Sequence, residues 1–194
     1  MKTFGFCIPL DEMRRKMVTK KKLRFDIGDW IVHYSYGVGK VVDIIEKGLE
    51  GQQETFFEVS TSEIEYWIPI DKADSSHIEP IRSERDFDHA IQIIAKPPQP
   101  MNETQNRNKR VIYERWLDGS LPARAALIRD LYGRNKIREL SYDEKVTFTK
   151  AENFFISEWI ITSPDLSKSM ARQRLNEALE TSTQMEADET EKVL

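Results

Sequence analysis

The chain contains few of the residues that bind metals or form disulfides: one cysteine, Cys7, and three scattered histidines among 194 residues. A single cysteine cannot form an intrachain disulfide, and a structural zinc site needs several cysteines or histidines in close spacing. No apolar run approaches the ~20 residues that span a bilayer, and the N-terminus lacks the apolar core and cleavage site of a secretory signal. We therefore expect a cytoplasmic protein with no metal site, no other cofactor and no membrane partner.

The sequence also lacks a catalytic constellation. The serines do not have the context of a nucleophile elbow, and no histidine lies near Cys7 in the sequence. The spacing of the aspartates and glutamates is typical of solvated helix faces. We therefore expect a non-enzymatic protein without catalytic residues or a small-molecule substrate. An enzyme whose site assembles only in space is a third interpretation, which a deep pocket lined by perturbed titratable groups would favour.

The net charge of −4 argues against a histone-like DNA-binding protein, but the charges are unevenly distributed. Residues 1–24 are strongly basic, whereas the tail from Met185 is acidic. Terminal segments of this composition are commonly disordered. We therefore predict a flexible basic arm over residues 1–24 and a disordered acidic tail over residues 182–194. The arm either makes a loose electrostatic contact with nucleic acid or has no role.

The stretch Ile27–Glu46 has the pattern of two β-strands joined by a glycine-rich turn. Residues 30–34 show the period-two pattern of a half-buried strand. Gly37 and Gly39 follow, and glycine permits a positive φ or the close approach of another strand. A phosphate-binding loop would need a helix after the glycines, whereas β-branched residues follow here. The pattern therefore indicates antiparallel strands rather than a nucleotide-binding fold.

Further strands are predicted at Thr55–Val59 and Ile64–Ile70, with a hairpin loop over Glu46–Glu54. Pro69 cannot donate a hydrogen bond to a ladder, so it indicates an edge strand or the end of a strand. Because no helix intervenes, these strands predict a small antiparallel β-barrel over residues 25–82. An exposed edge strand can pair with a strand of another protein, or loops of the same chain can cover it.

From Arg82 the apolar period changes from two to 3.6 residues, which predicts an all-α module over residues 83–181. Ser83 is a helix cap, and Ser141 with Glu144 forms a capping box. Gly133 is expected to end a helix. The predicted helices run from Ser83 to the proline-rich segment 96–100, over Glu103–Leu117 and Pro122–Tyr132, from Ser141 through Trp159, and from Ser163-Pro164 to Thr181. The predicted fold class is therefore α+β, a β-barrel followed by a helical domain.

The predicted helix Glu103–Leu117 combines an apolar stripe with many basic and amide side chains. The residues expected to face inward are Ile112, Tyr113, Trp116 and Leu117. The basic and amide residues are Gln105, Asn106, Arg107, Asn108, Lys109, Arg110 and Arg115, and these residue types contact phosphates and minor-groove edges. A second basic cluster, Arg134, Lys136 and Arg138, is expected in the loop before Ser141. Alternatively this is an ordinary charged helix face; DNA binding is favoured if the two clusters face the same way.

An ordered series of motifs across both modules resembles the CarD/CdnL family of transcription regulators. In the β module the similar residues are Gly28-Asp29, Tyr36-Gly37-Val38-Gly39, Val41–Glu46 and Ile68-Pro69-Ile70. In the helical module they are Gly119-Ser120, Arg129–Tyr132, Leu140–Lys145 and Ala151. A related β module occurs in the transcription-repair coupling factor, but that helicase embeds it in a far larger chain. The architecture therefore favours a stand-alone CarD-like regulator.

The resemblance implies a Tudor-like barrel that docks on the β subunit of bacterial RNA polymerase. It also implies a helical module that contacts double-stranded promoter DNA at the upstream edge of the melted bubble and helps to stabilise the open complex. By register with the family, the polymerase-binding residues are Lys47, Leu49, Trp67 and Ile68. The DNA-binding residues implied are Gln105, Arg107, Asn108, Lys109, Arg110, Arg134 and Lys136.

Two positions depart from the family pattern. Trp67 stands where a basic residue is common, so we expect docking to depend more on apolar and stacking contacts. Gln105 stands where family members have a tryptophan that wedges into the minor groove. Glutamine can hydrogen-bond a base edge but cannot act as an apolar wedge, so we expect weaker or altered stabilisation of the open complex. The alternative function is a protein-interaction adaptor on RNA polymerase whose helical module does not bind DNA.

Overall fold

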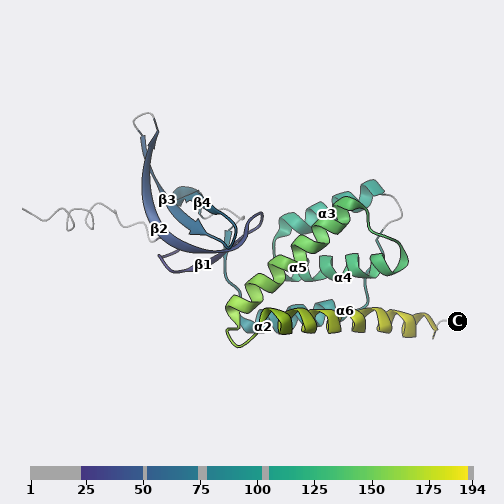
Figure 1. Ribbon diagram of the computed structural model, residues 1–194. Coiled ribbons are helices and arrows are strands. Elements are labelled where there is room, and N and C mark those ends of the chain that lie inside the picture. Colours follow the sequence, from purple (N-terminus) through teal and green to yellow (C-terminus); the bar gives the residue numbers. More distant parts are fainter. Residues whose placement is uncertain (1–22, 50–51, 74–77, 102–104, 192–194) are drawn as a thin grey trace, which may run out of the picture.

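The computed structural model describes residues 23–49, 52–73, 78–101 and 105–191. Within these ranges the side chains of Leu49, Gln52 and residues 105–107 and 185–191 are outside the described part. Figure 1 shows a curved sheet followed by a bundle of helices. Residues 1–22 of the predicted basic arm lie outside the described residues, so the structure does not test that prediction.

The β module is a five-stranded antiparallel sheet with the strand order β4-β3-β2-β1-β5. Its strands are β1 (Trp30–His33), β2 (Gly37–Leu49), β3 (Gln52–Ser60), β4 (Glu65–Pro69) and β5 (Ile78–Pro80). The sheet is curved but open (Figure 1), so the prediction of a closed barrel is wrong. β4 stops at Pro69, where the 3-10 helix η1 (Ile70–Lys72) begins, and β5 has only three residues. These two short edge strands do not pair with each other.

The central hairpin is longer than the sequence pattern predicts. The β2–β3 ladder continues to the pair Leu49 and Gln52, so strands occupy most of the predicted loop over Glu46–Glu54. Phe25 precedes the first strand, and its side chain is buried in the core. The prediction of an edge strand ending at Pro69 is confirmed. The core of the sheet consists of Phe25, Ile31, Val41, Phe57, Val59, Ile68, Ala73 and Ile78.

The helical module contains α2 (Glu84–Ile94), α3 (Gln105–Asp118), α4 (Leu121–Ile137), α5 (Tyr142–Thr162) and α6 (Lys168–Glu191). The predicted caps at Ser83 and Ser141 are confirmed. The Ser83 N–H donates to Asp86 Oδ2 at 2.8 Å, and the Ser141 N–H donates to Glu144 Oε2 at 2.8 Å. These carboxylates also lie at the positive end of each helix dipole, which favours the start of α2 and α5 at these positions.

Two helix boundaries differ from the prediction. α4 continues through Gly133 to Ile137, because this glycine permits close packing instead of ending the helix. A Cβ atom at Gly133 would lie 2.5 Å from the Cβ of Pro98. α6 begins only at Lys168, since Ser163 is the C-cap of α5, and it continues to Glu191 through much of the predicted acidic tail.

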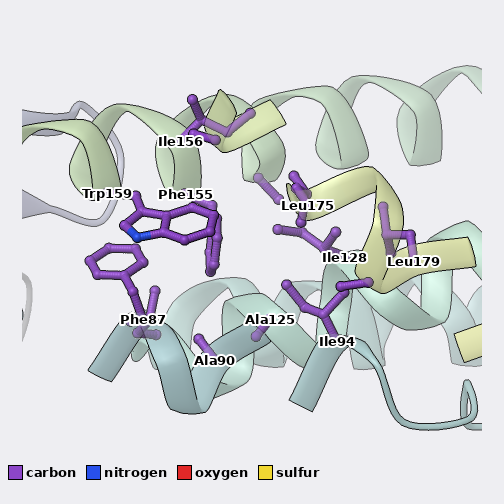
Figure 2. Packing of buried hydrophobic residues seen from close by; sticks show 14 of the residues in the cluster. Phe87, Ala90, Ile94, Ala125, Ile128, Phe155, Ile156, Trp159, Leu175 and Leu179 are labelled. Atoms are coloured by element: carbon purple, nitrogen blue, oxygen red, sulfur yellow. The ribbon is translucent and has the colours of Figure 1, made fainter. Parts of the chain in front are cut away.

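The helices α2, α4, α5 and α6 enclose one apolar core, part of which Figure 2 shows. The Phe87 and Trp159 rings stack with centroids 5.8 Å apart, and Phe155 meets both rings edge-on. Both α2 and α4 place a fully buried alanine in this core, Ala90 and Ala125. The helix α3 contributes to a smaller cluster of Ile112, Leu127, Leu131 and Leu140. Burial of this apolar surface is the main stabilising contribution to the bundle.

A buried ion cluster joins the two modules at the linker between β5 and α2. The Glu158 carboxylate of α5 is fully buried. It accepts hydrogen bonds from the Arg82 N–H at 3.3 Å, the Arg82 guanidinium at 3.2 Å and Arg124 Nη1 at 3.2 Å. Arg82 Nη2 also donates to the Gly119 carbonyl at 3.0 Å. The cluster therefore fixes the linker against α4 and α5.

Candidate functional site

The outer face of the sheet carries an exposed tryptophan on the edge strand β4. Trp67 is 50% exposed, and its Nε1 donates to Glu58 Oε1 at 3.0 Å. The Lys47 ammonium lies 2.9 Å from the centroid of the indole ring. The structure therefore brings together two of the residues that the family resemblance assigns to polymerase binding. The other two differ: Ile68 is 5% exposed and faces the core, and the side chain of Leu49 is outside the described part.

A second exposed indole lies on the same face of the sheet and was not among the predicted residues. Trp30 is paired in the ladder with Lys40, and Lys40 with Ser60. Because alternate residues of a strand share a face, Ser60 is on the same side as Glu58, the partner of Trp67. Trp30 is 36% exposed, with the Lys40 ammonium 5.8 Å from its ring centroid. The outer face therefore presents two tryptophans, each beside a lysine.

The start of α3 contains three of the predicted DNA-binding residues, Gln105, Arg107 and Asn108. The side chains of Gln105 and Arg107 are outside the described part. Asn108 is 1% exposed and lies one helical turn before the buried Ile112. Its side chain is on the inner face of α3, so the contact of Asn108 with DNA stays a prediction that this burial does not favour.

Lys109 and Arg110 are on the outer side of α3. The Lys109 ammonium is bonded to Asp143 Oδ2 at 3.1 Å, and Arg110 Nε donates to Glu114 Oε1 at 2.7 Å. The exposed fractions of the two basic side chains are 55% and 81%. Ion pairs as exposed as these contribute little to stability, because water and salt screen the charges. Both cations can therefore exchange their carboxylate partner for a phosphate.

Two residues of the second basic cluster, Arg134 and Lys136, lie in the last turn of α4 and not in a loop as predicted, whereas Arg138 follows as the extended C-cap. Arg134 has a side chain only 10% exposed, and its Nε donates to Glu144 Oε1 at 3.1 Å. Its guanidinium thus holds α4 against the start of α5 and is poorly placed to contact DNA. Lys136 is exposed, with its ammonium 4.9 Å from the centroid of the Tyr132 ring.

Both basic clusters converge on the first turn of α5. Lys109 of α3 contacts Asp143, and Arg134 of α4 contacts the next residue, Glu144. Burial opposes ionisation of Glu144, but the hydrogen bonds from Ser141 and the charge of Arg134 together lower its pKa below the ordinary value. The ionised Glu144 therefore links the start of α5 to the end of α4 through its ion pair with Arg134.

Two residues of α3 that were expected to face inward are exposed. Tyr113 is 62% exposed and Leu117 is 39% exposed. Ile112 and Trp116 are the residues that pack inward, and Arg115 contacts the buried carboxylate of Asp130. The apolar stripe of α3 is thus narrower than the sequence pattern suggests, which leaves a tyrosine on the surface beside Lys109.

The two modules match two domain families of the same regulators. Residues 25–82 match the CarD-like/TRCF RID domain, and residues 89–176 match the CarD C-terminal domain. The chain belongs to the CarD-like family. This result confirms the resemblance drawn from the sequence motifs, and the CarD-like family is one of non-enzymatic transcription factors.

A curated relative covers most of this CarD-like chain. It is the "Putative transcription factor YdeB" of Bacillus subtilis (strain 168). The two sequences are 29% identical over 136 residues, which are 69% of this chain and 89% of the relative. The similarity therefore includes both modules and is not confined to one of them.

The described part of the CarD-like chain shows neither a candidate metal site nor a candidate membrane-spanning helix. Among the residues with described structure, no group of three or more histidine, cysteine, aspartate or glutamate side chains could hold a metal ion. None of the described helices is both long and apolar enough to pass through a bilayer. The features that stand out are instead surfaces: the outer face of the sheet and the outer side of α3 where it meets α5.

Proposed function

We propose that this CarD-like protein is a bacterial transcription regulator that binds the β subunit of RNA polymerase through its sheet. Its helical module binds double-stranded promoter DNA near the upstream edge of the bubble and modulates the stability of the open complex. The observation that carries the proposal is the match of both modules, in order, to the two CarD domain families.

The polymerase contact is supported by the position and chemistry of Trp67. β4 is an edge strand, and an exposed edge can accept a strand of a partner through main-chain hydrogen bonds. Tryptophan is among the residues that contribute most to binding at protein interfaces. Lys47 adds a positive charge beside the indole. Ile68 contributes its backbone to this edge, because its side chain belongs to the core.

The DNA contact is supported by the exposed cations of α3. Lys109 and Arg110 have side chains more than half exposed, and lysine and arginine are the principal phosphate ligands in DNA complexes. Gln105 and Arg107 precede them on the same helix and stay in the proposed surface. Asn108 does not, because it is buried. In place of an apolar wedge, Gln105 provides hydrogen bonding to base edges, so we propose only a moderate effect on the open complex.

A second candidate function is an adaptor on RNA polymerase whose helical module does not bind DNA. Lys109, Arg110 and Arg134 each have a carboxylate partner within the protein, and this pairing favours the adaptor. The net charge of −4 also does not favour DNA binding. The two candidates predict different behaviour toward salt, since phosphate contacts release counterions and make DNA affinity fall as salt rises.

A salt titration of binding to duplex promoter DNA separates the two candidates. If DNA is bound, Lys109→Glu/Arg110→Glu weakens binding and makes the slope of log K against log salt shallower by about 2, at ~0.9 per phosphate contact. The matched control is Lys168→Glu/Arg174→Glu on α6, which changes the net charge equally and lies outside the proposed surface. Affinity that is absent, or independent of salt and of the α3 pair, would support the adaptor instead.

The polymerase contact has a separate test. We expect Trp67→Ala to lose binding to isolated polymerase β subunit in a pull-down while its affinity for duplex DNA stays at the wild-type value. Met170→Ala, a change at another exposed apolar residue on α6, serves as the control. Undiminished capture of the β subunit by the Trp67→Ala protein would exclude this face as the docking site.

A further inference from the structure

A groove with two cavities crosses α5. The first cavity, about 310 Å³, lies between α3 and α5 and is lined by Lys109, Tyr113 and Trp116 among others. The second, about 670 Å³, lies between α5 and the loops of the β module at Tyr36 and Thr61. Both volumes fall in the range of about 300–1,000 Å³ that is usual for ligand sites. Val146 and Lys150 line both cavities, so the two adjoin on this part of α5, and together we call them the groove.

Exposed tyrosines line this groove along its length. Tyr113 is 62% exposed in the first cavity, and Tyr142 and Tyr36 are 81% and 47% exposed in the second. The Tyr36 ring is held in place by His33, with centroids 4.6 Å apart and planes 22° apart. Exposed aromatic rings can act as stacking platforms for planar groups.

Lysines accompany the tyrosines. Lys150 stands on the wall that the two cavities share, with its ammonium 5.2 Å from the Trp116 ring centroid and 5.3 Å from that of Phe154. No carboxylate among the described residues forms an ion pair with Lys150 within 4.0 Å. Lys109 and Lys145 line the groove on either side of it.

The acidic residues of the groove are mostly neutralised. Asp143 is paired with Lys109, and Glu144 with Arg134. Glu63 lies at the end formed by the β module. Lys145 is bonded to Glu139 at 2.5 Å, but both side chains are more than half exposed. The middle of the groove therefore offers a cation without a competing carboxylate, and this charge complements a negatively charged chain.

We propose that this groove binds single-stranded DNA, with unpaired bases stacked on Tyr113, Tyr142 and Tyr36 and the backbone passing Lys150. Successive base faces are available to protein side chains along an unpaired strand. A regularly stacked duplex would present phosphates to the lysines, and a base face only at a step that is unstacked. The inference goes beyond the proposed function: it adds a contact with a melted strand, and that contact needs neither the outer face of the sheet nor Arg110.

The test is fluorescence anisotropy of the full-length protein with a labelled oligothymidylate of ~12 nucleotides, a length within the roughly 4–16 nucleotides of known single-strand sites. We expect Tyr113→Ala and Tyr142→Ala each to weaken binding by about 5- to 150-fold, the range for loss of one base–aromatic stack. Lys150→Gln should weaken binding and make the salt slope shallower by ~0.7, the value for one phosphate contact on a single strand.

The controls separate this inference from the proposed function. Ile137→Ala removes an apolar side chain that is 80% exposed and lines neither cavity, and Lys168→Gln removes a lysine of α6. Both should bind the oligonucleotide as wild type does, and Tyr142→Ala should still bind duplex DNA and polymerase β subunit normally. Undetectable oligonucleotide binding, or equal binding by the wild type and the groove variants, overturns the inference. Binding to duplex DNA and to the polymerase β subunit tests the proposed function independently of this result.

Discussion

Loss of the buried charge of Glu158 should destabilise the protein strongly. Its carboxylate is the only acid within ion-pair distance of Arg124 among the described residues, and the Arg124 side chain is 6% exposed. Burial and the neighbouring Arg82 lower the pKa of Arg124, and Glu158 opposes that decrease. Glu158→Gln keeps the size of the side chain but leaves two guanidinium groups close together without a counter-charge.

The expected magnitude follows from the burial of the cluster. Removing one partner of a buried ion pair costs about 3–5 kcal/mol, because the remaining charge is left uncompensated. A domain of ordinary stability has only about 5–15 kcal/mol in total. With a denaturant dependence of roughly 2–3 kcal/mol/M in urea, the midpoint of unfolding should fall by about 1–2 M.

The assay is urea unfolding followed by far-ultraviolet circular dichroism, with Glu180→Gln, a change at an exposed glutamate of α6, as the matched control. The double variant Arg124→Leu/Glu158→Leu should recover part of the lost stability, because it leaves one guanidinium without a counter-charge, that of Arg82, instead of two. If Glu158→Gln unfolds at the same urea concentration as the control, with an unchanged slope, the reasoning about this cluster is refuted.

Two further predictions concern single positions. Gly133→Ala should destabilise the protein by about 1–3 kcal/mol, because the added Cβ would lie 2.5 Å from Pro98. This overpacking outweighs the gain in helix propensity, which is at most about 1 kcal/mol. A raised melting temperature of the variant would contradict this prediction. The lowered pKa of Glu144 means that its ionised form contributes stability at neutral pH, and this contribution is lost as the pH falls below the ordinary glutamate range toward the folded-state pKa. Glu144→Gln should therefore be less stable at pH 7 and lose less stability on acidification, and an unchanged pH profile of unfolding would exclude that role.

The sequence predicted elements well where local signals determine them. The period of two in the strands, the change to 3.6 after Arg82 and the caps at Ser83 and Ser141 depend on neighbouring residues. The proline at position 69 also marked the edge strand. These predictions are confirmed because each depends on hydrogen bonds formed within a few residues of the signal.

The sequence failed where contacts between distant residues decide the outcome. Gly133 has the sequence pattern of a helix C-terminus, but it packs against Pro98, which lies 35 residues earlier in the chain. Closure of the sheet depends on pairing of strands at its two ends, which no local pattern reveals. The burial of Asn108 and the exposure of Tyr113 depend on how α3 rotates against α4 and α5. Alternation of basic and amide residues in α3 could not distinguish the two faces.

The most direct test of the proposed function is the lifetime of the polymerase–promoter open complex after challenge with competitor DNA. The wild-type protein should change this lifetime, Trp67→Ala should lose the effect together with polymerase binding, and Lys109→Ala/Arg110→Ala should lose it while still binding free polymerase. Gln105→Trp should lengthen the lifetime if position 105 meets the minor groove. If the wild-type protein binds polymerase but neither it nor any of these variants alters the lifetime, the two-contact regulator is contradicted and the adaptor is favoured.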